Sequence, residues 1–229
     1  MCRWRPTSDN LVAAAIAASA AELIASLRRQ PLLVVLRPTS PQQAFEAISA
    51  LEQLGVRHVE IAWQPQPSWI SLGRELLAAF PGLLLGAASV CTVAALEAAQ
   101  RAGFAYAVSP ILDRELVARA AQELVLIPGV MSPTEVHQAR CWGCGLVKLF
   151  PAAALGAGYW RRLAAPLGDP LPFCIAAGGL AVADVRPWLA AGVDAVALGS
   201  GLSLSPEATA PLRQLLAQWR PASMADQGC

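Results

Sequence analysis

The stretch LLVVLRPTSPQQAFEAISALEQLGVRHVEIAW, residues 32–63, contains the structural unit that the rest of the chain repeats. Two short apolar runs, 32–37 and 58–63, flank a segment in which apolar residues recur at helical spacing. That segment opens on the pair Ser40-Pro41 and closes on Gly55, as helices commonly do. The stretch therefore predicts a strand, a helix and a second strand.

The same alternation continues along the chain. Further strand-like runs cover 83–89, 105–110, 125–130, 145–151, 172–180 and 194–202, and a last helix is expected over 205–219. Strands that alternate with helices indicate a parallel sheet, and eight such units in about 200 residues indicate an α/β fold of the (β/α)8 TIM-barrel type. A doubly wound open sheet is the alternative, but its G-x-G-x-x-G after the first strand is missing.

The bulk composition favours a single domain that binds a small molecule. With 229 residues, 55% of them hydrophobic and 14% charged, the chain suits one barrel domain over 1–229. A net charge of +1 without an arginine-rich run indicates neither a nucleic-acid nor a membrane partner. Residues 8–29 predict an amphipathic helix before the barrel, with an export segment as the alternative. The tail at about 221–229 is expected to be disordered.

Six cysteines are scattered without a compact spacing scheme, which favours reduced thiols and a cytoplasmic protein. Cys141 and Cys144 form a C-x-x-C pair, so zinc and redox chemistry have to be weighed. Zinc would need two further ligands, and a redox pair would be expected to open a helix rather than end one. We therefore expect no metal and no cofactor.

Polar side chains stand where the predicted strands end. In a barrel of this type, the carboxyl ends of the strands face the active-site mouth. The polar residues and glycine turns at those ends are Arg37, Glu60, Gln64, Ser89, Ser109 and Lys148, then Gly178-Gly179 and Gly199-Ser200-Gly201.

Lys148 is the only lysine, since 16 of the 17 basic residues are arginines. Strand alternation puts Leu146 and Phe150 inward beside it, and an amine desolvated in this way has a lowered pKa. Such an amine can attack a carbonyl and form a Schiff base. Glu60, also on an even-numbered strand, can share its layer and shuttle protons. The alternative is a buried lysine–glutamate ion pair that only contributes to structure.

The two glycine turns follow strands seven and eight, which is the usual phosphate site of this fold. Gly178 and Gly179 offer bare backbone amides just before a helix, and Ser200 adds a hydroxyl after Gly199. Together they predict a phosphate-binding site.

Seven segments, taken in order, give the chain a family resemblance. They are GVRHVEIAW (55–63), LGAASVCT (85–92), AVSP (107–110), LIPGVMSPTE (126–135), VKLFPA (147–152), CIAAGGL (174–180) and ALGSGL (197–202). With them, residues 16–218 resemble the KDPG/KHG aldolase family. The resemblance implies a class I aldehyde-lyase of carbohydrate metabolism, of the Entner–Doudoroff kind. Such an enzyme reversibly cleaves a 2-keto-3-deoxy-6-phospho sugar acid to pyruvate and glyceraldehyde 3-phosphate, and its protomers form a homotrimer.

The resemblance also implies roles for individual residues. Lys148 would form the Schiff base and Glu60 would act as general acid and base. Substrate would be bound by Arg37, Gln64, Ser89, Pro110, Phe150 and Ala177, and phosphate by Gly178, Gly179, Gly199 and Ser200.

Three positions bear on the substrate. The gluconate branch of the family carries an arginine four residues beyond the glutamate, where this chain has Gln64, whereas the galactonate branch uses one at the end of strand one, like Arg37. Ala177 replaces a threonine of the gluconate enzymes. The C4 epimer therefore stays open, as does cleavage of 4-hydroxy-2-ketoglutarate. A degenerate barrel that binds a sugar phosphate without turnover, and another phosphate-binding barrel enzyme such as an isomerase or synthase, remain as alternatives.

Overall fold

The computed structural model describes residues 8–121, 123–199, 202–205 and 208–219, with the helical backbone alone for 8–18. Ser200 and the tail expected over 221–229 lie outside these ranges. The strands are β1 (Leu32–Leu36), β2 (His58–Ala62), β3 (Leu84–Ala88), β4 (Tyr106–Val108), β5 (Val125–Ile127), β6 (Gly129–Val130), β7 (Leu146–Leu149), β8 (Phe173–Ala177) and β9 (Ala195–Leu198). The first helices are α1 (Ser8–Arg29), α2 (Pro41–Leu54), α3 (Ser68–Ala79), α4 (Val93–Ala102), α5 (Arg114–Ala120) and α6 (Pro133–Cys141). They are followed by α7 (Ala152–Leu155), α8 (Tyr159–Arg162), α9 (Ala164–Leu167), the 3-10 turn η1 (Val182–Asp184), α10 (Val185–Ala190) and α11 (Ala210–Ala217).

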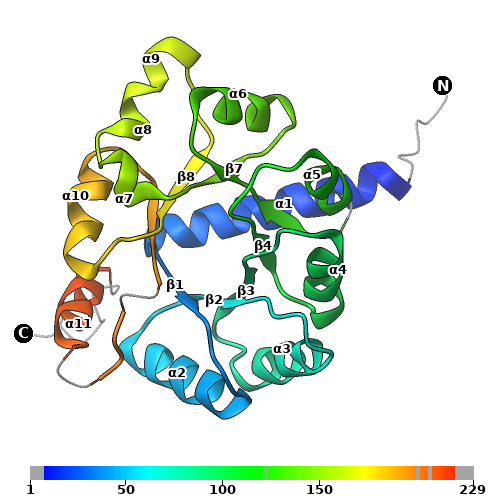
Figure 1. Ribbon diagram of the computed structural model, residues 1–229, viewed down its shortest axis with the longest axis vertical. Coiled ribbons are helices and arrows are strands. Elements are labelled where there is room, and N and C mark those ends of the chain that lie inside the picture. Colours follow the sequence, from blue (N-terminus) through cyan, green and yellow to red (C-terminus); the bar gives the residue numbers. More distant parts are fainter. Residues whose placement is uncertain (1–7, 122, 200–201, 206–207, 220–229) are drawn as a thin grey trace, which may run out of the picture.

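The strands form a parallel barrel ringed by helices, as the alternation predicts (Figure 1). Their order is β5-β4-β3-β2-β1-β9-β8-β7-β6, and every pairing is parallel. The predicted (β/α)8 fold with an extra N-terminal helix is confirmed. Within the described residues, no helix is both long and apolar enough to cross a bilayer.

The fifth predicted strand, 125–130, is broken into β5 and β6 at Pro128. Proline has no N–H to continue a ladder, so the chain bends there and each half pairs with a different neighbour. β5 pairs with β4 and β6 pairs with β7, and the two halves together close the ring. At the junction, the Lys148 N–H donates to the Pro128 carbonyl at 2.8 Å.

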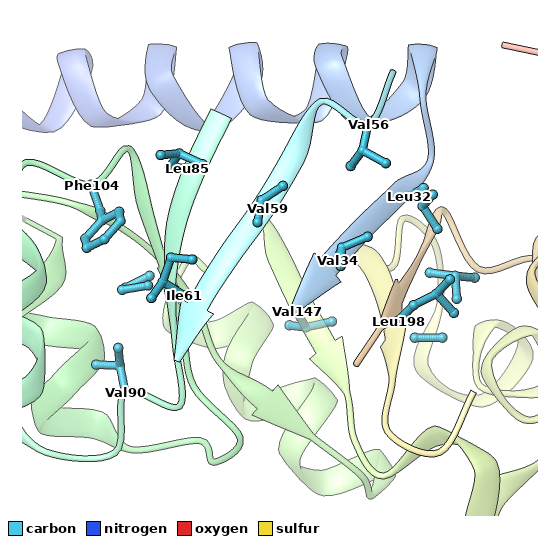
Figure 2. Packing of buried hydrophobic residues seen from close by; sticks show 14 of the residues in the cluster. Leu32, Val34, Val56, Val59, Ile61, Leu85, Val90, Phe104, Val147 and Leu198 are labelled. Atoms are coloured by element: carbon cyan, nitrogen blue, oxygen red, sulfur yellow. The ribbon is translucent and has the colours of Figure 1, made fainter. Parts of the chain in front are cut away.

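Most strand residues are buried, because one face of the sheet lines the barrel interior and the other meets the helices. Side chains such as Val34, Val59 and Ile61 face the helices (Figure 2). The alternate residues, among them Leu33 and Val35, form a second cluster inside the barrel.

Helix α1 crosses the amino ends of the strands and closes that end of the barrel (Figures 1 and 2). Leu23 and Leu27 of α1 belong to the interior cluster. Ser26 Oγ lies 2.8 Å from Nε2 of the buried His58, whose Nδ1 lies 3.0 Å from the Leu32 carbonyl oxygen. Because this end is plugged, a ligand has to enter at the carboxyl ends of the strands.

The helix ends follow local sequence signals. Ser40 accepts a hydrogen bond from the Gln43 N–H at the start of α2, and Gly55 ends that helix at φ 93°. The last helix, α11, starts at Ala210 rather than at 205. Pro211 then occupies its first turn, where the absence of an N–H has no consequence.

Gly129 provides a test of the closing seam, which is the junction of β5 and β6 at Pro128. A Cβ at this position would lie 2.3 Å from the carbonyl carbon and oxygen of Pro110, which are backbone atoms that cannot move aside. We expect Gly129→Ala to lower the free energy of unfolding by about 2 kcal/mol or more, because overpacking distorts the seam. Urea unfolding midpoints at an unchanged m-value measure the effect.

The matched control is Gly145→Ala, because nothing lies within 4 Å of a Cβ at Gly145. That change should stay within about 0.5 kcal/mol of the parent chain. Equal free energies of unfolding for the two variants would contradict the conclusion that close packing of Gly129 against the Pro110 backbone stabilises the seam.

Candidate active site

Lys148 projects from the middle of β7 into the barrel. Leu146 belongs to the interior cluster and Phe150 packs against it, whereas Val147 and Leu149 face the helices. The Lys148 side chain is 7% exposed, and its Nζ lies 4.8 Å from the centroid of the Phe150 ring. The amine therefore has apolar walls, as the alternation predicts.

Burial is the main cause that lowers the pKa of Lys148 from its ordinary value. The Glu60 carboxylate opposes the shift, and the Arg37 guanidinium adds to it. Cys91, exposed after β3, also acts on Lys148 through its charge when ionised. A lowered pKa leaves a larger share of the amine neutral, which is the nucleophilic form.

Glu60 lies on β2 and is 2% exposed. Burial raises its pKa to about 7, although the Lys148 and Arg37 charges pull in the other direction. Among the described residues no ion pair involves Glu60 or Lys148, so their charged atoms lie more than 4.0 Å apart. A carboxyl that titrates near neutral pH can both give and take a proton, which a locked ion pair does not do.

A cavity of about 680 Å³ opens at the carboxyl ends of the strands, a volume typical of small-ligand sites. Its lining includes Val35, Arg37, Lys148, Phe150, Ala177, Gly178, Gly179, Ala197 and Gly199. Seven predicted site residues thus meet in one cavity. A groove of similar size beside α4 is lined by Glu97, Gln100, Arg101 and other residues of the outer helices, and it contains none of the predicted residues.

The predicted anion-binding groups lie on one side of this cavity. A Cβ on Gly199 would lie 3.7 Å from Nη1 of Arg37, so the guanidinium lies beside Gly199 at the end of β9. Gly178 and Gly179 have φ of 96° and 77°, in the region that side-chain-bearing residues avoid. They turn the backbone sharply where β8 ends. Ser200 lies outside the described residues.

Four predicted site residues do not line the cavity with Lys148: Glu60, Gln64, Ser89 and Pro110. The Gln64 amide donates a 2.8 Å hydrogen bond to the Pro38 carbonyl and lines a smaller neighbouring cavity. Ser89 follows β3 at φ 61°, and Pro110 is partly buried after β4. Their proximity to substrate stays a prediction.

Two neighbours of the catalytic candidates were not predicted from the sequence. Tyr106 on β4 is fully buried, and the Glu60 charge helps to raise the pKa of its phenol. Strand alternation could have placed Tyr106 inward. It stands four residues, an even number, before Pro110, and residues at even spacing on a strand point to the same face, which for the predicted substrate residue Pro110 is the inner one. Nothing in the sequence marks Cys91 as a neighbour of Lys148.

The C-x-x-C pair forms no metal site among the described residues. Cys141 Sγ lies 3.5 Å from His137 Nε2 on α6, and Cys144 lies beyond the end of that helix. In the part of the chain that the structure describes, no three His, Cys, Asp or Glu side chains come together in a way that could hold a metal.

A buried amine and a carboxyl of raised pKa below a glycine-rimmed barrel mouth are the groups that a lyase of the Schiff-base class requires. Comparison with known proteins agrees. The family profile described as KDPG and KHG aldolase matches residues 23–210. The chain belongs to this family of aldehyde-lyases.

Individual relatives support the same assignment. The chain is 31% identical to a probable 2-dehydro-3-deoxy-6-phosphogalactonate aldolase of Rhizobium meliloti, over 76% of this chain and 82% of that protein. It is 29% identical to the 2-dehydro-3-deoxy-6-phosphogalactonate aldolase of Escherichia coli, over 75% and 84% of the two chains. A KDPG aldolase from Legionella pneumophila, solved with pyruvate as a covalent carbinolamine intermediate, superposes with a TM-score of 0.71. That match has 26% identity and covers 86% of this chain and 95% of the other.

The raised pKa of Glu60 predicts a pH-dependent destabilisation. Since the folded pKa of about 7 exceeds the ordinary 4.5, the unfolded state ionises first and folding is disfavoured progressively from pH 4.5 to 7. Glu60→Gln removes this penalty. We expect it to raise the free energy of unfolding by about 1 to 3 kcal/mol above pH 7 and to change it little near pH 4.5. Urea unfolding at the two pH values measures the difference.

Glu97→Gln is the control, because Glu97 is exposed on α4 and should show no such pH-dependent gain. A Glu60→Gln variant that is less stable than the parent chain above pH 7 would contradict the claim that ionisation of the buried Glu60 destabilises the fold.

Proposed function

We propose that the chain reversibly cleaves a 2-keto-3-deoxy-6-phospho sugar acid to pyruvate and glyceraldehyde 3-phosphate, with Lys148 as the Schiff-base residue. The observation that carries this proposal is the desolvated Lys148 amine, which opens on a cavity of about 680 Å³ with Glu60 near it. The fold rigidly directs both side chains inward, so neither has to be recruited from a loop.

In the proposed reaction, the neutral Lys148 amine attacks the C2 ketone and forms a carbinolamine. Loss of water gives a protonated imine, which accepts the electron pair released when the C3–C4 bond breaks. The aldehyde leaves as the C4 hydroxyl loses its proton, and the enamine left on Lys148 is protonated at C3. Hydrolysis then releases pyruvate. Glu60 moves the protons in these steps, since its pKa of about 7 lets it serve as acid and base.

The charged ends of the substrate would have partners on neighbouring strands of the mouth, at the end of β1 and at the ends of β8 and β9. We assign the carboxylate to Arg37, whose guanidinium forms no hydrogen bond or ion pair within the described residues. The phosphate would approach the turns at Gly178, Gly179 and Gly199, where the absence of side chains exposes backbone amides.

Arg37 and Gln64 favour the galactonate epimer as substrate. Arg37 lines the cavity, whereas Gln64 is bound to Pro38 and lines a different one. The Rhizobium meliloti and Escherichia coli relatives are both named as phosphogalactonate aldolases.

We further propose that the whole chain acts as one barrel domain and assembles as a cytoplasmic homotrimer. Sedimentation equilibrium measures the association state.

Trapping with borohydride tests the Schiff base. Incubation with pyruvate and borohydride should add one pyruvate-derived mass to Lys148, because reduction makes the imine permanent. Trypsin then no longer cleaves after residue 148, so the peptide 141–161 should appear intact by mass spectrometry. Lys148→Met should form no adduct and should lower kcat by about 10⁴-fold or more, as expected when a nucleophile is removed.

The amino terminus is the competing amine, and its peptide serves as the internal control. A chain that binds pyruvate but yields no adduct at Lys148 would be a binding barrel without turnover. Cleavage of the phosphorylated keto acid by Lys148→Met would rule out the assigned nucleophile.

The substrate assignment is tested by assaying both C4 epimers side by side. We expect the galactonate epimer to give the higher kcat/KM, and Arg37→Gln to lower that value by about 10- to 100-fold through loss of a charge-assisted contact. Gln64→Ala should change kcat/KM less than Arg37→Gln does. Arg114→Gln, at an exposed arginine that opens α5, is the control and should leave kcat/KM unchanged. A preference for the gluconate epimer would reverse the substrate assignment.

A further inference from the structure

Two buried polar atoms in the described part of the chain have no hydrogen-bond partner: Glu60 Oε2 and the hydroxyl oxygen of Tyr106. Both residues are almost fully enclosed, at 2% and 0% exposure. A buried polar group without a partner is unfavourable, so two of them in one interior need a physical reason.

The strand register brings these two groups toward each other. Glu60 on β2 is the register partner of Gly86 on β3, and Gly86 is the register partner of Tyr106 on β4. The three residues form one row across neighbouring strands. Because partners in register point to the same face of a sheet, both side chains enter the barrel interior.

Gly86 leaves the space that the tyrosine ring fills. A Cβ on Gly86 would lie 2.5 Å from Cε2 and Cζ of Tyr106, so the far part of the ring lies directly over this glycine. The ring thus extends from β4 across β3 toward β2, where Glu60 stands. Its hydroxyl, attached to Cζ, is the part of the side chain that reaches furthest toward the carboxyl.

We propose that Tyr106 is a positioning residue for Glu60. Since neither atom bonds the other directly, its hydroxyl donates a hydrogen bond to one bridging water molecule, which donates to Oε2 and leaves Oε1 to exchange protons on the Lys148 side. This role rests on the proposed function, in which Glu60 moves the protons of the reaction.

The hydroxyl acts as a donor and does not exchange its own proton. Burial, with the Glu60 charge as a smaller cause, raises the pKa of Tyr106 well above its ordinary value, so the phenol stays protonated. Its donated bond favours the charged carboxylate. Lys148 from β7 and Arg37 from the end of β1 also act on Glu60 through their charges. Tyr106 is therefore the neutral member of the set, whose contribution disappears in a phenylalanine variant that leaves every charge in place.

Tyr106→Phe tests this role, because it keeps the ring over Gly86 and removes only the hydroxyl. We expect the apparent pKa on the acidic limb of the kcat profile to rise by about one unit or more, since a hydrogen bond to a charged group is worth that much. The titration of the Glu60 carboxyl in the resting protein, followed by its infrared C=O band, should shift in the same direction. Pyruvate trapping at Lys148 should be retained.

Three variants make the measurement specific. Glu60→Gln identifies the Glu60 infrared band by its loss. Tyr159→Phe removes the other tyrosine hydroxyl, which donates to the Met131 carbonyl, and should leave the Glu60 band and the acidic limb unchanged. In a Glu60→Gln background, Tyr106→Phe should have no further effect on the pH profile.

An unchanged infrared midpoint and acidic limb in Tyr106→Phe would show that Tyr106 only fills space, and the inference would be overturned. Loss of pyruvate trapping in that variant would also overturn it, because the hydroxyl would then support Lys148 or the cavity as a whole. The proposed function fails separately, through the absence of trapping in the parent chain. Even in that case the infrared midpoint still reports whether Tyr106 and Glu60 are bonded.

Discussion

The closure of the barrel at Pro128 is the constraint on which the site depends. This proline divides one strand into β5 and β6, and its carbonyl accepts the Lys148 N–H at 2.8 Å. Two residues further along each strand, the Phe150 N–H donates to the Val130 carbonyl at 3.0 Å. The same backbone bonds that close the ring therefore fix the direction of the lysine side chain. A nucleophile held on a rigid strand needs less reorganisation to reach its substrate than one held on a loop.

Closure also creates the environment that lowers the pKa of the Lys148 amine. One end of the interior is plugged by Leu23 and Leu27 of α1, so water reaches Lys148 only from the mouth. The same burial that lowers the pKa of Lys148 raises that of Glu60 to about 7. Both shifts favour the neutral form of the group, which is the form that the amine needs for attack. Folding stability is reduced at neutral pH by this arrangement, as is common where an active site enforces burial on ionisable groups.

Much of this arrangement could be predicted from the sequence because strand geometry has a period of two. A single lysine at position 148 between Leu146 and Phe150 defines an inward face, and the run of eight strand–helix units defines the barrel. The break at Pro128 could not be read with the same certainty, since a proline is also tolerated at a strand edge. The hydrogen bond from Gln64 to Pro38 depends on how two loops approach each other, and no local pattern encodes that.

Tyr106 was missed because its role depends on a residue that has no side chain. The ring fits only because β3 presents Gly86 at the register position between Tyr106 and Glu60. A sequence pattern marks Tyr106 as inward but does not show which neighbouring strand leaves room for it. Positions 86 and 106 are therefore coupled. A residue larger than glycine at position 86 would displace the Tyr106 ring and break the proposed bond to Glu60.

The residues that we propose for the chemistry and those that we propose for substrate selection occupy different parts of the fold. Lys148, Glu60 and Tyr106 lie within strands, where the ladder and the core fix their direction. Arg37 and the glycines that line the cavity lie just beyond strand ends, where a substitution leaves the ladder intact. Exchange of an arginine between the ends of β1 and β2 can thus change how a substrate carboxylate is held without disturbing the amine. This separation explains why one reaction can be kept in the family while its members are named for different sugar acids.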